Sequence, residues 1–493
     1  MKRIVIIGAG IAGLATGCYG QMNGFETEIF EMHDKPGGLC TSWKRKGYTI
    51  DGCIHHLAGA SPASKLYPLW QELGATKSLD ITFDKILRRT VDDDGNELNF
   101  YTDIERLRSH LLDISPGDKD LVEHYIKAIQ KFTRFELLAA IGSGGLGMIR
   151  MLPHIPKIMK WGPVTLEDFA GRFRNPFIRK AFPTAQYDFP NIPMMIHLSF
   201  MAGCSGRLLG WPTGGSLEFA KRIAGHYEDL GGKIHYRSKV KRVITENDTA
   251  TGIELTDGTA IMADRVISAA DGYSTIYGML GGKYTDSFIE EYYSNPPDEQ
   301  EMNAYVSLGI KKDFPGLPHA LTWIMTDKIE LAGRSYEKLD MEIFNSRTGM
   351  APEGGTVVRV PFTASYSYWK GLRESGEKYK AEKERISETV INRLDLFLAG
   401  LKEKVEVVDV STPLTVERFT GNYHGMQVWM PAKKPGRTMG KGLTRTLPGL
   451  EKFHMVGQWA QGLIGISTAA ILGKKLMKSI CKSEGRRFVT SSA

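Results

Sequence analysis

One stretch near the start of the chain decides the fold: Arg3-Ile4-Val5-Ile6-Ile7-Gly8-Ala9-Gly10-Ile11-Ala12-Gly13. Its apolar, β-branched first part is typical of a buried parallel strand. Gly8 permits a tight turn, Gly10 removes a side chain where a pyrophosphate must approach the backbone, and Gly13 lets the next helix pack against the strand. A diphosphate can then lie on the free N–H groups at the start of that helix. The stretch therefore predicts a nucleotide-binding βαβ unit.

A second strand, Glu26 to Phe30, ends at Glu31, which lies 23 residues after Gly8. A carboxylate at this place can accept hydrogen bonds from the ribose hydroxyls, and it favours a free ribose over a 2′-phosphate. NAD and FAD share this fingerprint, so it leaves the choice between them open. Three glycines and an acid can also coincide in an ordinary βαβ unit.

The next segment carries a family resemblance. Glu31 and Met32 are followed closely by a Gly37-Gly38-Leu39 turn. An acid such as Glu31 followed by such a turn resembles the flavin amine oxidase and phytoene desaturase superfamily. Trp43 to Gly52 looks like the basic hairpin that leads to the flavin ring in that family. The resemblance favours FAD over NAD and implies a flavin-dependent oxidoreductase.

Two distant segments extend the resemblance in the expected order. The first runs from Trp211-Pro212-Thr213-Gly214-Gly215-Ser216 through a strand around Val240 to Ala263–Asp271, and the second is Phe453–Trp459 with the helix after it. The family commonly has Pro-Gly-Gly-Gly in that last segment, where this chain has Gly462-Leu463-Ile464-Gly465. The resemblance places backbone groups at Val240 against the adenine. It implies FAD contacts at Gly8, Gly10, Ile11, Ala12, Gly13, Glu31, Met32, Gly37, Gly38, Leu39, Asp51, Val240, Ala270, Asp271, Gly457, Gln458, Gly465, Ile466 and Ser467.

These segments predict an α/β fold in which a Rossmann-like FAD-binding domain is built from discontinuous pieces and an α+β substrate domain is inserted. We expect the FAD-binding domain at 1–80, 206–285 and 416–485, and the substrate domain at 81–205 and 286–415. The substrate domain should hold a mixed or antiparallel sheet with strands at 302–308 and 356–360, a helix at 382–401 and a helical lid at about 115–200. Residues 486–493 are expected to be a flexible tail.

Two motifs narrow the chemistry. A segment of retinol saturases is similar to Asp51-Gly52-Cys53-Ile54-His55-His56 of this chain. This chain has Cys53 at the position where those proteins usually have a glycine. Thr412 to Gly421 looks like a stretch of phytoene desaturases, carotenoid isomerases and saturases. The resemblance implies desaturation, saturation or cis-trans isomerisation of carbon–carbon double bonds in a long apolar polyene or isoprenoid. A hydride would be exchanged at the flavin N5.

A saturase would also need a proton donor, and the candidates are His55, His56, Tyr423 and His424. For each histidine alone, a structural role is the simpler explanation, and the place of His55 in the motif makes it the strongest catalytic candidate. Adjacent residues on an extended strand point to opposite faces, so His55 and His56 predict no metal site. Four further residues can line an apolar tunnel or belong to an ordinary core: Met194, Met195, Phe200 and Met201.

Composition is that of a globular enzyme, with 42% hydrophobic, 24% charged and 10% aromatic residues among 493. A net charge of +7 without large basic runs argues against a nucleic-acid partner. The five cysteines are scattered, which predicts reduced thiols in a cytoplasmic protein. No apolar run reaches the roughly 18 residues of a membrane-spanning helix, so any membrane contact must be peripheral.

One segment fits such a contact. Residues 148–161 combine methionines, a tryptophan and four basic residues without an acid, a composition suited to the inner face of an anionic membrane. A lid packed on the protein's own core fits equally well. A second basic cluster, at Lys474, Lys475, Lys478, Lys482, Arg486 and Arg487, can assist docking or form a solvated helix face.

Two other functions remain open at this point. The first is amine oxidation, which should need aromatic side chains on the substrate side of the flavin. The second is a non-catalytic FAD-binding scaffold. The sequence does not identify the electron partner.

Overall fold

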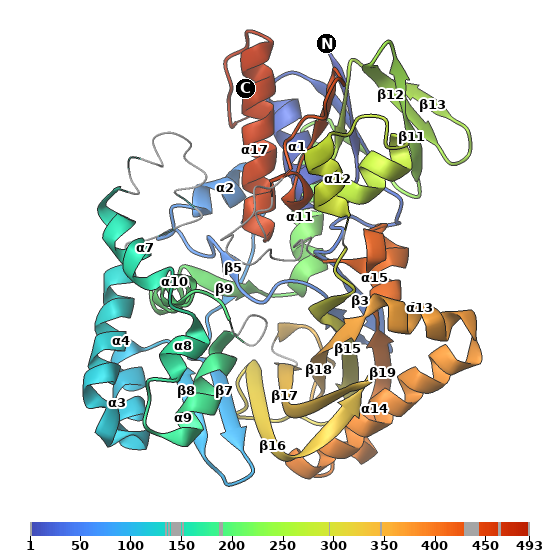
Figure 1. Ribbon diagram of the computed structural model, residues 1–493. Coiled ribbons are helices and arrows are strands. Elements are labelled where there is room, and N and C mark those ends of the chain that lie inside the picture. Colours follow the sequence, from blue (N-terminus) through green and yellow to red (C-terminus); the bar gives the residue numbers. More distant parts are fainter. Residues whose placement is uncertain are drawn as a thin grey trace.

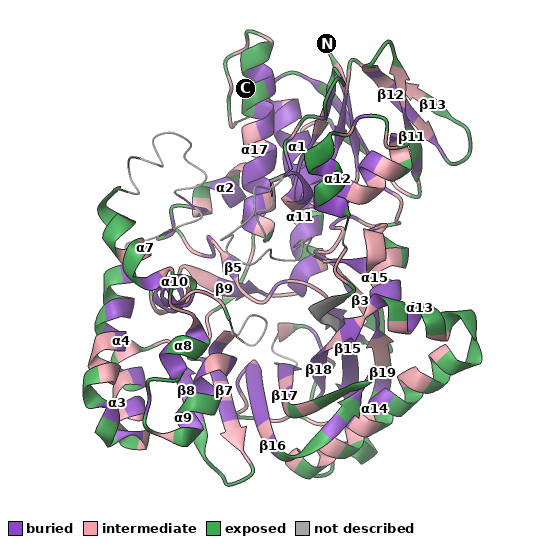
Figure 2. Cartoon of the chain, viewed as in Figure 1, coloured by how far each residue is buried: buried purple, intermediate pink, exposed green. Residues whose placement is uncertain are grey.

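The computed structural model describes residues 2–133, 136, 139, 149, 152–186, 191–294, 296–345, 348–427, 443–461 and 465–491. Figure 1 shows two halves, one around helices α1 (Ile11–Met22) and α17 (Ile466–Ser483), and one around a large sheet with a helical group at its side. In Figure 2 the strands and the inner helix faces are buried, while the outer helices are exposed.

A parallel five-stranded sheet forms the core of the first half. Its order is β10-β2-β1-β14-β20, and every neighbouring pair is parallel. The strands are β1 (Arg3–Ile7), β2 (Glu26–Phe30), β10 (Lys233–His235), β14 (Arg265–Ser268) and β20 (Phe453–Met455). The predicted bounds of β1 and β2 are confirmed. Segments from both ends and the middle of the chain therefore build one sheet, which confirms the predicted fold class.

Close helix packing covers this sheet. A Cβ at Gly473 of α17 would lie 3.0 Å from Ala15 Cβ of α1 and 3.1 Å from the carbonyl of Ala12, so the two helices approach closely. Helix α11 (Gly215–Asp229) packs on α1 too, since a Cβ at Gly17 would lie 2.7 Å from the Tyr227 ring. A three-stranded layer lies beside the sheet and is formed by β11 (Val240–Glu246), β12 (Thr249–Leu255) and β13 (Ala260–Met262).

The second half contains a seven-stranded sheet of order β19-β15-β18-β17-β16-β7-β8. All neighbours are antiparallel except β16 and β7, so the sheet is mixed. Its strands are β7 (Ile86–Asp92), β8 (Glu97–Tyr101), β15 (Glu299–Ile310), β16 (Ala320–Leu331), β17 (Arg334–Asn345), β18 (Thr356–Ser365) and β19 (Val405–Ser411). The strands predicted at 302–308 and 356–360 lie within β15 and β18. Because β7 and β8 join later strands, both insertions contribute to one sheet.

The helix predicted at 382–401 is displaced. Helix α14 spans Glu377–Phe397, and Leu398 leaves the helical conformation with φ −115° and ψ 71°. Gly400, with φ +76°, turns the chain into a 3-10 turn at Lys402–Lys404, which precedes β19. The turn chemistry of glycine thus ends the helix before the apolar pattern does.

Helices beside this sheet form their own aromatic core. Tyr125, Phe169, Phe182 and His197 are buried together, and the Tyr125 hydroxyl lies 2.7 Å from His197 Nε2. The helices are α3 (Ile104–Ile114), α4 (Lys119–Phe132), α7 (Ile155–Trp161), α8 (Leu166–Ala170), α9 (Pro176–Ala181) and α10 (Met194–Ser205). Met194 and Met201 are fully buried in this core, while Met195 and Phe200 are partly buried at its edge. Among the described residues, no helix is long and apolar enough to cross a membrane.

The remaining described elements connect these units. They are β3 (Ser42–Arg45), β4 (Tyr48–Asp51), β5 (Leu57–Ala58), β6 (Ile81–Thr82), β9 (Leu209–Pro212), α2 (Tyr67–Glu72), α12 (Ser287–Tyr293), α13 (Tyr366–Glu374), α15 (Pro413–Thr420) and α16 (Gln458–Gln461). Strands β3 and β4 form the hairpin expected at 43–52.

The predicted flexible tail is instead docked as far as Val489. Arg486 donates hydrogen bonds to the carbonyls of Asn23 and Gly24 (both 3.0 Å), and the Val489 N–H donates to Asn23 Oδ1 (2.8 Å). Lys474 of the same basic cluster pairs with Glu72 (2.5 Å). These charges therefore serve contacts within the protein, which a charge pattern alone does not reveal.

Candidate active and cofactor site

The glycine turn after β1 leaves room at one position. Gly8 has φ +95°, which favours glycine, and a Cβ at Gly13 would lie 2.0 Å from the Gly8 carbonyl oxygen. At Gly10 a Cβ would meet nothing nearer than the Gly37 carbonyl oxygen at 3.9 Å. Gly10 also caps α1 without any side-chain hydrogen bond. The first N–H groups of α1 thus face a space that a pyrophosphate fits.

The Gly37-Gly38 turn lies directly against this loop. The Gly37 N–H donates to the Ala9 carbonyl (2.8 Å), and a Cβ at Gly38 would lie 3.4 Å from Gly10 Cα. Gly37 has φ +113°. The two glycine turns predicted to bind FAD are therefore brought together.

A second helix begins at the same edge of the parallel sheet. Gly457, with φ +105°, follows β20, and a Cβ there would lie 3.3 Å from Ala12 Cβ. Helix α17 begins at Ile466 after Gly465, which has φ +106°, and among the described residues no atom lies within 4 Å of a Cβ position at Gly465. Two uncapped helix starts at the carboxyl edge suit a dinucleotide with two phosphates. The motif Gly462-Leu463-Ile464-Gly465 differs from the Pro-Gly-Gly-Gly run of the family, and its first three residues lie outside the described part of the chain.

Glu31 is held ready beside the glycine turn. Its two carboxylate oxygens accept the N–H groups of Ala9 (2.7 Å) and His33 (2.9 Å). Burial raises the pKa of Glu31, although these two N–H groups oppose the shift. Asp271, after β14, accepts the Ser274 N–H (2.7 Å), and burial raises its pKa as well. Val240 opens β11 as a buried residue, and Ala270 is partly buried beside it.

His55 belongs to a buried ionic network. Its Nδ1 lies 2.5 Å from Glu342 Oε1 on β17, and Glu342 pairs with Arg359 on β18. Arg359 in turn donates to the Asp51 carbonyl. The Asp51 carboxylate accepts the N–H groups of Gly52 (2.9 Å) and of Ser216 (3.1 Å). The loop that carries His55 is thus fixed from both halves of the molecule.

Burial and ion pairing shift the pKa values of two carboxyl groups in this network, Glu342 and Asp51. Burial alone would raise the pKa of Glu342, but Arg359 and His55 outweigh it and hold that pKa well below its usual range. Burial raises the pKa of Asp51, with Ser216 and Arg359 acting in the opposite direction. Glu342 and Arg359 are 1% and 2% exposed, so this is an ion pair shielded from solvent.

His56 lies with His55 in the loop between β4 and β5 but has other partners. Its Nε2 lies 3.4 Å from Asp84 Oδ2, and its ring meets Phe200 of α10 edge-on at 5.2 Å. Burial lowers the pKa of nearby His319, which Asp84 and Glu342 partly counteract. Asp84 and Glu342 therefore each face a histidine of the His55-His56 pair.

Tyr423 and His424 lie in a separate ring stack. The Tyr423 ring centroid is 3.7 Å from Tyr273 on one side and 3.9 Å from His424 on the other, and His424 stacks on Tyr366 at 4.1 Å. Both faces of the Tyr423 ring are covered by its neighbours. This packing favours a structural role, so His55 and His56 are the stronger catalytic candidates.

A chain of side chains joins the cofactor segment to the ionic network. Gln458 donates to the Gln427 carbonyl (2.5 Å), Gln427 Nε2 donates to the Tyr305 hydroxyl (3.3 Å), and Arg359 lies over the Tyr305 ring at 4.6 Å. Ser467 Oγ donates to the Ala58 carbonyl (3.3 Å), just after the His55-His56 loop.

Sequence reasoning missed four residues here: Asp84, His319, Glu342 and Arg359. The signal existed for one of them, since Arg359 interrupts the apolar run Thr356-Val357-Val358-Arg359-Val360 at a buried position. A buried charge in a strand implies a partner. Within the described ranges, no group of histidine, cysteine, aspartate or glutamate side chains is arranged to hold a metal ion.

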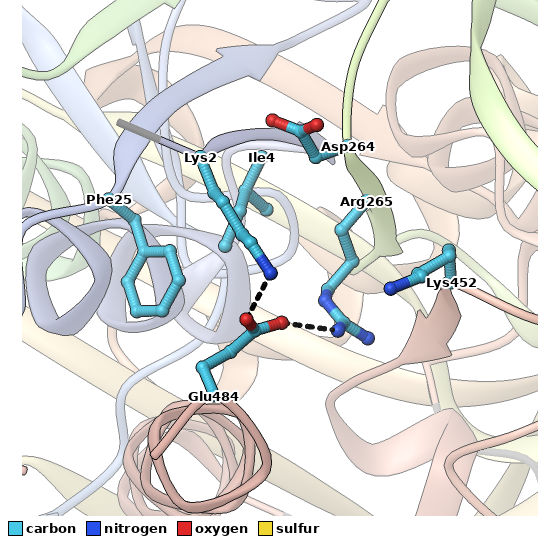
Figure 3. Close-up of a pocket in the computed structure, with 7 residues that line it drawn as sticks. All are labelled: Lys2, Ile4, Phe25, Asp264, Arg265, Lys452 and Glu484. Atoms are coloured by element: carbon cyan, nitrogen blue, oxygen red, sulfur yellow. Dashed lines mark hydrogen bonds and ion pairs between the residues drawn. The ribbon is translucent and has the colours of Figure 1, made fainter. Parts of the chain in front are cut away.

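A small cavity of about 120 Å³ lies at the opposite, amino edge of the parallel sheet. Figure 3 shows the Glu484 carboxylate between the side chains of Lys2 and Arg265. Glu484 forms an ion pair with Lys2, and its Oε1 lies 3.2 Å from a guanidinium nitrogen of Arg265. These contacts join the two ends of the chain. Its polar lining and its distance along the strands from the glycine turns separate it from the cofactor site.

Comparison with known proteins agrees with this geometry. The family described as "Flavin containing amine oxidoreductase" matches residues 11–275. A prolycopene isomerase from Daucus carota is 23% identical over 95% of this chain and 78% of its own length. A lycopene-forming phytoene desaturase from Paracoccus sp. is 25% identical over 57% of each chain. The solved structure of an oxidoreductase from Methanosarcina mazei, 17% identical, covers 97% of this chain and 100% of its own with a TM-score of 0.62.

Replacing Gly10 by alanine tests the pyrophosphate position. A Cβ fits the protein itself at this point, so Gly10→Ala should fold with unchanged melting temperature once the cofactor is removed. It should bind FAD at least about tenfold more weakly, ~1.4 kcal/mol, because the methyl group occupies the space of the phosphates. Bound flavin absorbance and calorimetry measure both quantities. Gly13→Ala, which clashes within the protein, should lose stability and cofactor together; full FAD binding by Gly10→Ala would contradict the assignment.

The pH dependence of stability tests the Glu342 ion pair. Glu342→Gln leaves Arg359 buried without its charge partner, and we expect a loss of about 3–5 kcal/mol in the free energy of unfolding at pH 7. Because the folded-state pKa is depressed, the contribution of Glu342 is complete above the unfolded value of about 4.3 and shrinks as the pH falls towards the folded value. The gap between wild type and variant should therefore narrow in acid. Urea unfolding at several pH values measures this difference in the free energy of unfolding, with Glu337→Gln on the exposed face of β17 as control. An equal effect of both variants would refute the stabilising role of the buried ion pair.

Proposed function

Because the chain belongs to the flavin containing amine oxidoreductase family, we propose that it acts on the carbon–carbon double bonds of a long apolar polyene or isoprenoid. Family membership confirms the predicted FAD cofactor and the flavin-dependent oxidoreductase class. The similarity to relatives named prolycopene isomerase, over 95% of this chain and 78% and 82% of theirs, supports the choice of substrate class. Putrescine oxidase shares the fold with a TM-score of 0.53 at 13% identity, which supports no choice of substrate.

One observation carries the chemistry: His55 is hydrogen-bonded to a buried carboxylate. Bound FAD supplies hydride exchange. Glu342 holds Nδ1 of His55, and this contact sets which ring nitrogen carries the proton. Arg359 fixes the Glu342 carboxylate, so the ring orientation of His55 is fixed as well. A histidine held in this way can supply the proton that saturation or isomerisation of a double bond needs.

The helical group beside the large sheet suits the apolar part of such a substrate. Phe200 of α10 contacts His56, and α10 also packs against α7 at the outer edge of the molecule. The chain thus connects the His55-His56 loop to the surface through apolar side chains.

Anaerobic incubation of the reduced holoenzyme with carotenoid, retinoid and isoprenoid-quinone candidates tests the proposal. We expect a change in absorbance or mass for at least one polyene. His55→Gln should slow that reaction by about 10²-fold or more at equal FAD content, because it removes the proton donor. His235→Gln, which disrupts the His235–Glu28 pair (2.8 Å) on β10, is the matched control. No reaction with any candidate, or equal activity of His55→Gln, would count against the proposal.

We further propose that the enzyme is cytoplasmic and touches a membrane through α7 and the preceding turn. Leu152, Ile155 and Met159 are 58%, 42% and 73% exposed, and their spacing places them on one helix face. Trp161, by contrast, is buried against the helical core. One face of this segment is therefore available to a membrane, whereas the face with Trp161 packs on the protein's own core. Lys157 and Lys160 supply positive charge, while Met148, Arg150 and Met151 lie outside the described residues.

Vesicle flotation tests this contact. The wild-type protein should float with vesicles that contain anionic lipid, and the double variant Leu152→Glu/Met159→Glu should lose most of this binding, because charge is costly in the apolar interface. Leu396→Glu changes an equally exposed leucine (74%) on α14 and serves as control. Equal flotation of both variants, or none by the wild type, would rule out docking through this face.

A further inference from the structure

Two of the five cysteines lie across from each other at the base of the β3–β4 hairpin. The register pairs Ser42 with Asp51, and beyond it the Gly52 N–H donates to the Thr41 carbonyl (2.9 Å). Cys40 and Cys53 lie one position beyond this contact, just outside the strands, and the interaction between the two thiols is the largest influence on the pKa of each. Opposed residues of antiparallel strands have Cα atoms about 4.5–5.5 Å apart. That separation falls within the roughly 4.4–6.8 Å that a disulfide spans.

Their surroundings give the two thiols different roles. The Cys40 thiol, together with His55 and Arg359, lowers the pKa of Cys53, although burial and Asp51 oppose the shift. The interaction with Cys53 and burial raise the pKa of Cys40 well above its usual value. Cys53 is half-buried and Cys40 is buried. A thiolate near positive charge, beside a second thiol, is the arrangement of a nucleophilic and a resolving cysteine.

The other cysteines lack these features. Cys18, Cys204 and Cys481 are buried, and burial raises the pKa of each.

We propose that Cys40 and Cys53 are a peroxide-oxidisable pair that closes a reversible disulfide beside the cofactor loops. The Cys53 sulfur attacks hydrogen peroxide, an S–O bond forms, the O–O bond breaks, and the leaving hydroxide takes up a proton to give water. Cys40 then loses its proton and attacks the Cys53 sulfur, an S–S bond forms, the S–O bond breaks, and the hydroxyl group leaves as a second water. Two thiols are oxidised and one peroxide is reduced.

The disulfide would join two functional loops. The Cys40 N–H already donates to the Gly37 carbonyl (2.9 Å), and the Ser216 hydroxyl accepts the Ile54 N–H (2.8 Å) next to Cys53. The bond therefore ties the Gly37-Gly38 turn to the segment that ends in His55. This inference does not depend on which substrate the enzyme takes.

The test treats the FAD-loaded enzyme with hydrogen peroxide, blocks remaining thiols and maps the peptides by mass spectrometry without reduction. We expect a Cys40–Cys53 linked peptide before any change at Cys18, Cys204 or Cys481, and its loss after dithiothreitol. Cys40→Ser should leave a sulfenic acid on Cys53 that dimedone traps at least about tenfold faster than at Cys204, because thiolate fraction sets the rate.

Cys53→Ser is the matched control. Cys40 should then stay reduced on the same time scale, since its thiol is buried and protonated. Absence of the linked peptide while other cysteines oxidise would overturn the proposal. So would equal trapping at Cys53 and Cys204 in the Cys40→Ser variant, whether or not the variant keeps its activity.

Discussion

The ion pair between Glu342 and Arg359 is the interaction on which the candidate active site depends. It is shielded from solvent and lies between two strands of the mixed sheet, yet its other contacts reach the Asp51 carbonyl and His55. Buried charges are costly unless they are paired and hydrogen-bonded on every side. That cost is what fixes the relative position of the hairpin and the sheet, because any displacement would leave a charge without its partner.

The parallel sheet imposes a second constraint. Two helices begin at its carboxyl edge, α1 after β1 and α17 beyond β20, and a close glycine contact holds them side by side. Their N–H groups and positive ends face the same region. The mixed sheet and its helices then enclose the opposite side, so cofactor and substrate elements meet along the loops from Gly37 to His56.

Much of this arrangement could be predicted from local sequence. The glycines, the β-branched strand and Glu31 each have a position-specific physical reason, and β1 and β2 begin and end where expected. The His55-His56 loop was also identified. Its carboxylate partners were not, because Asp84 and Glu342 are distant in sequence and only the folded sheet brings them near. Helix α14 and the docked tail differ from expectation for a related reason: a turn glycine and backbone carbonyls of Asn23 and Gly24 decide them.

The order of strands in the parallel sheet bears on how the protein matures in the cell. Strand β1 is made long before its neighbour β14, and β20 with α17 follows later still. Synthesis proceeds at about 5–20 residues per second, so β1 and its early neighbour β2 wait for β14 and β20. The cofactor loops therefore cannot all come together until β20 and α17 have been made, which makes flavin uptake dependent on the docking of α17.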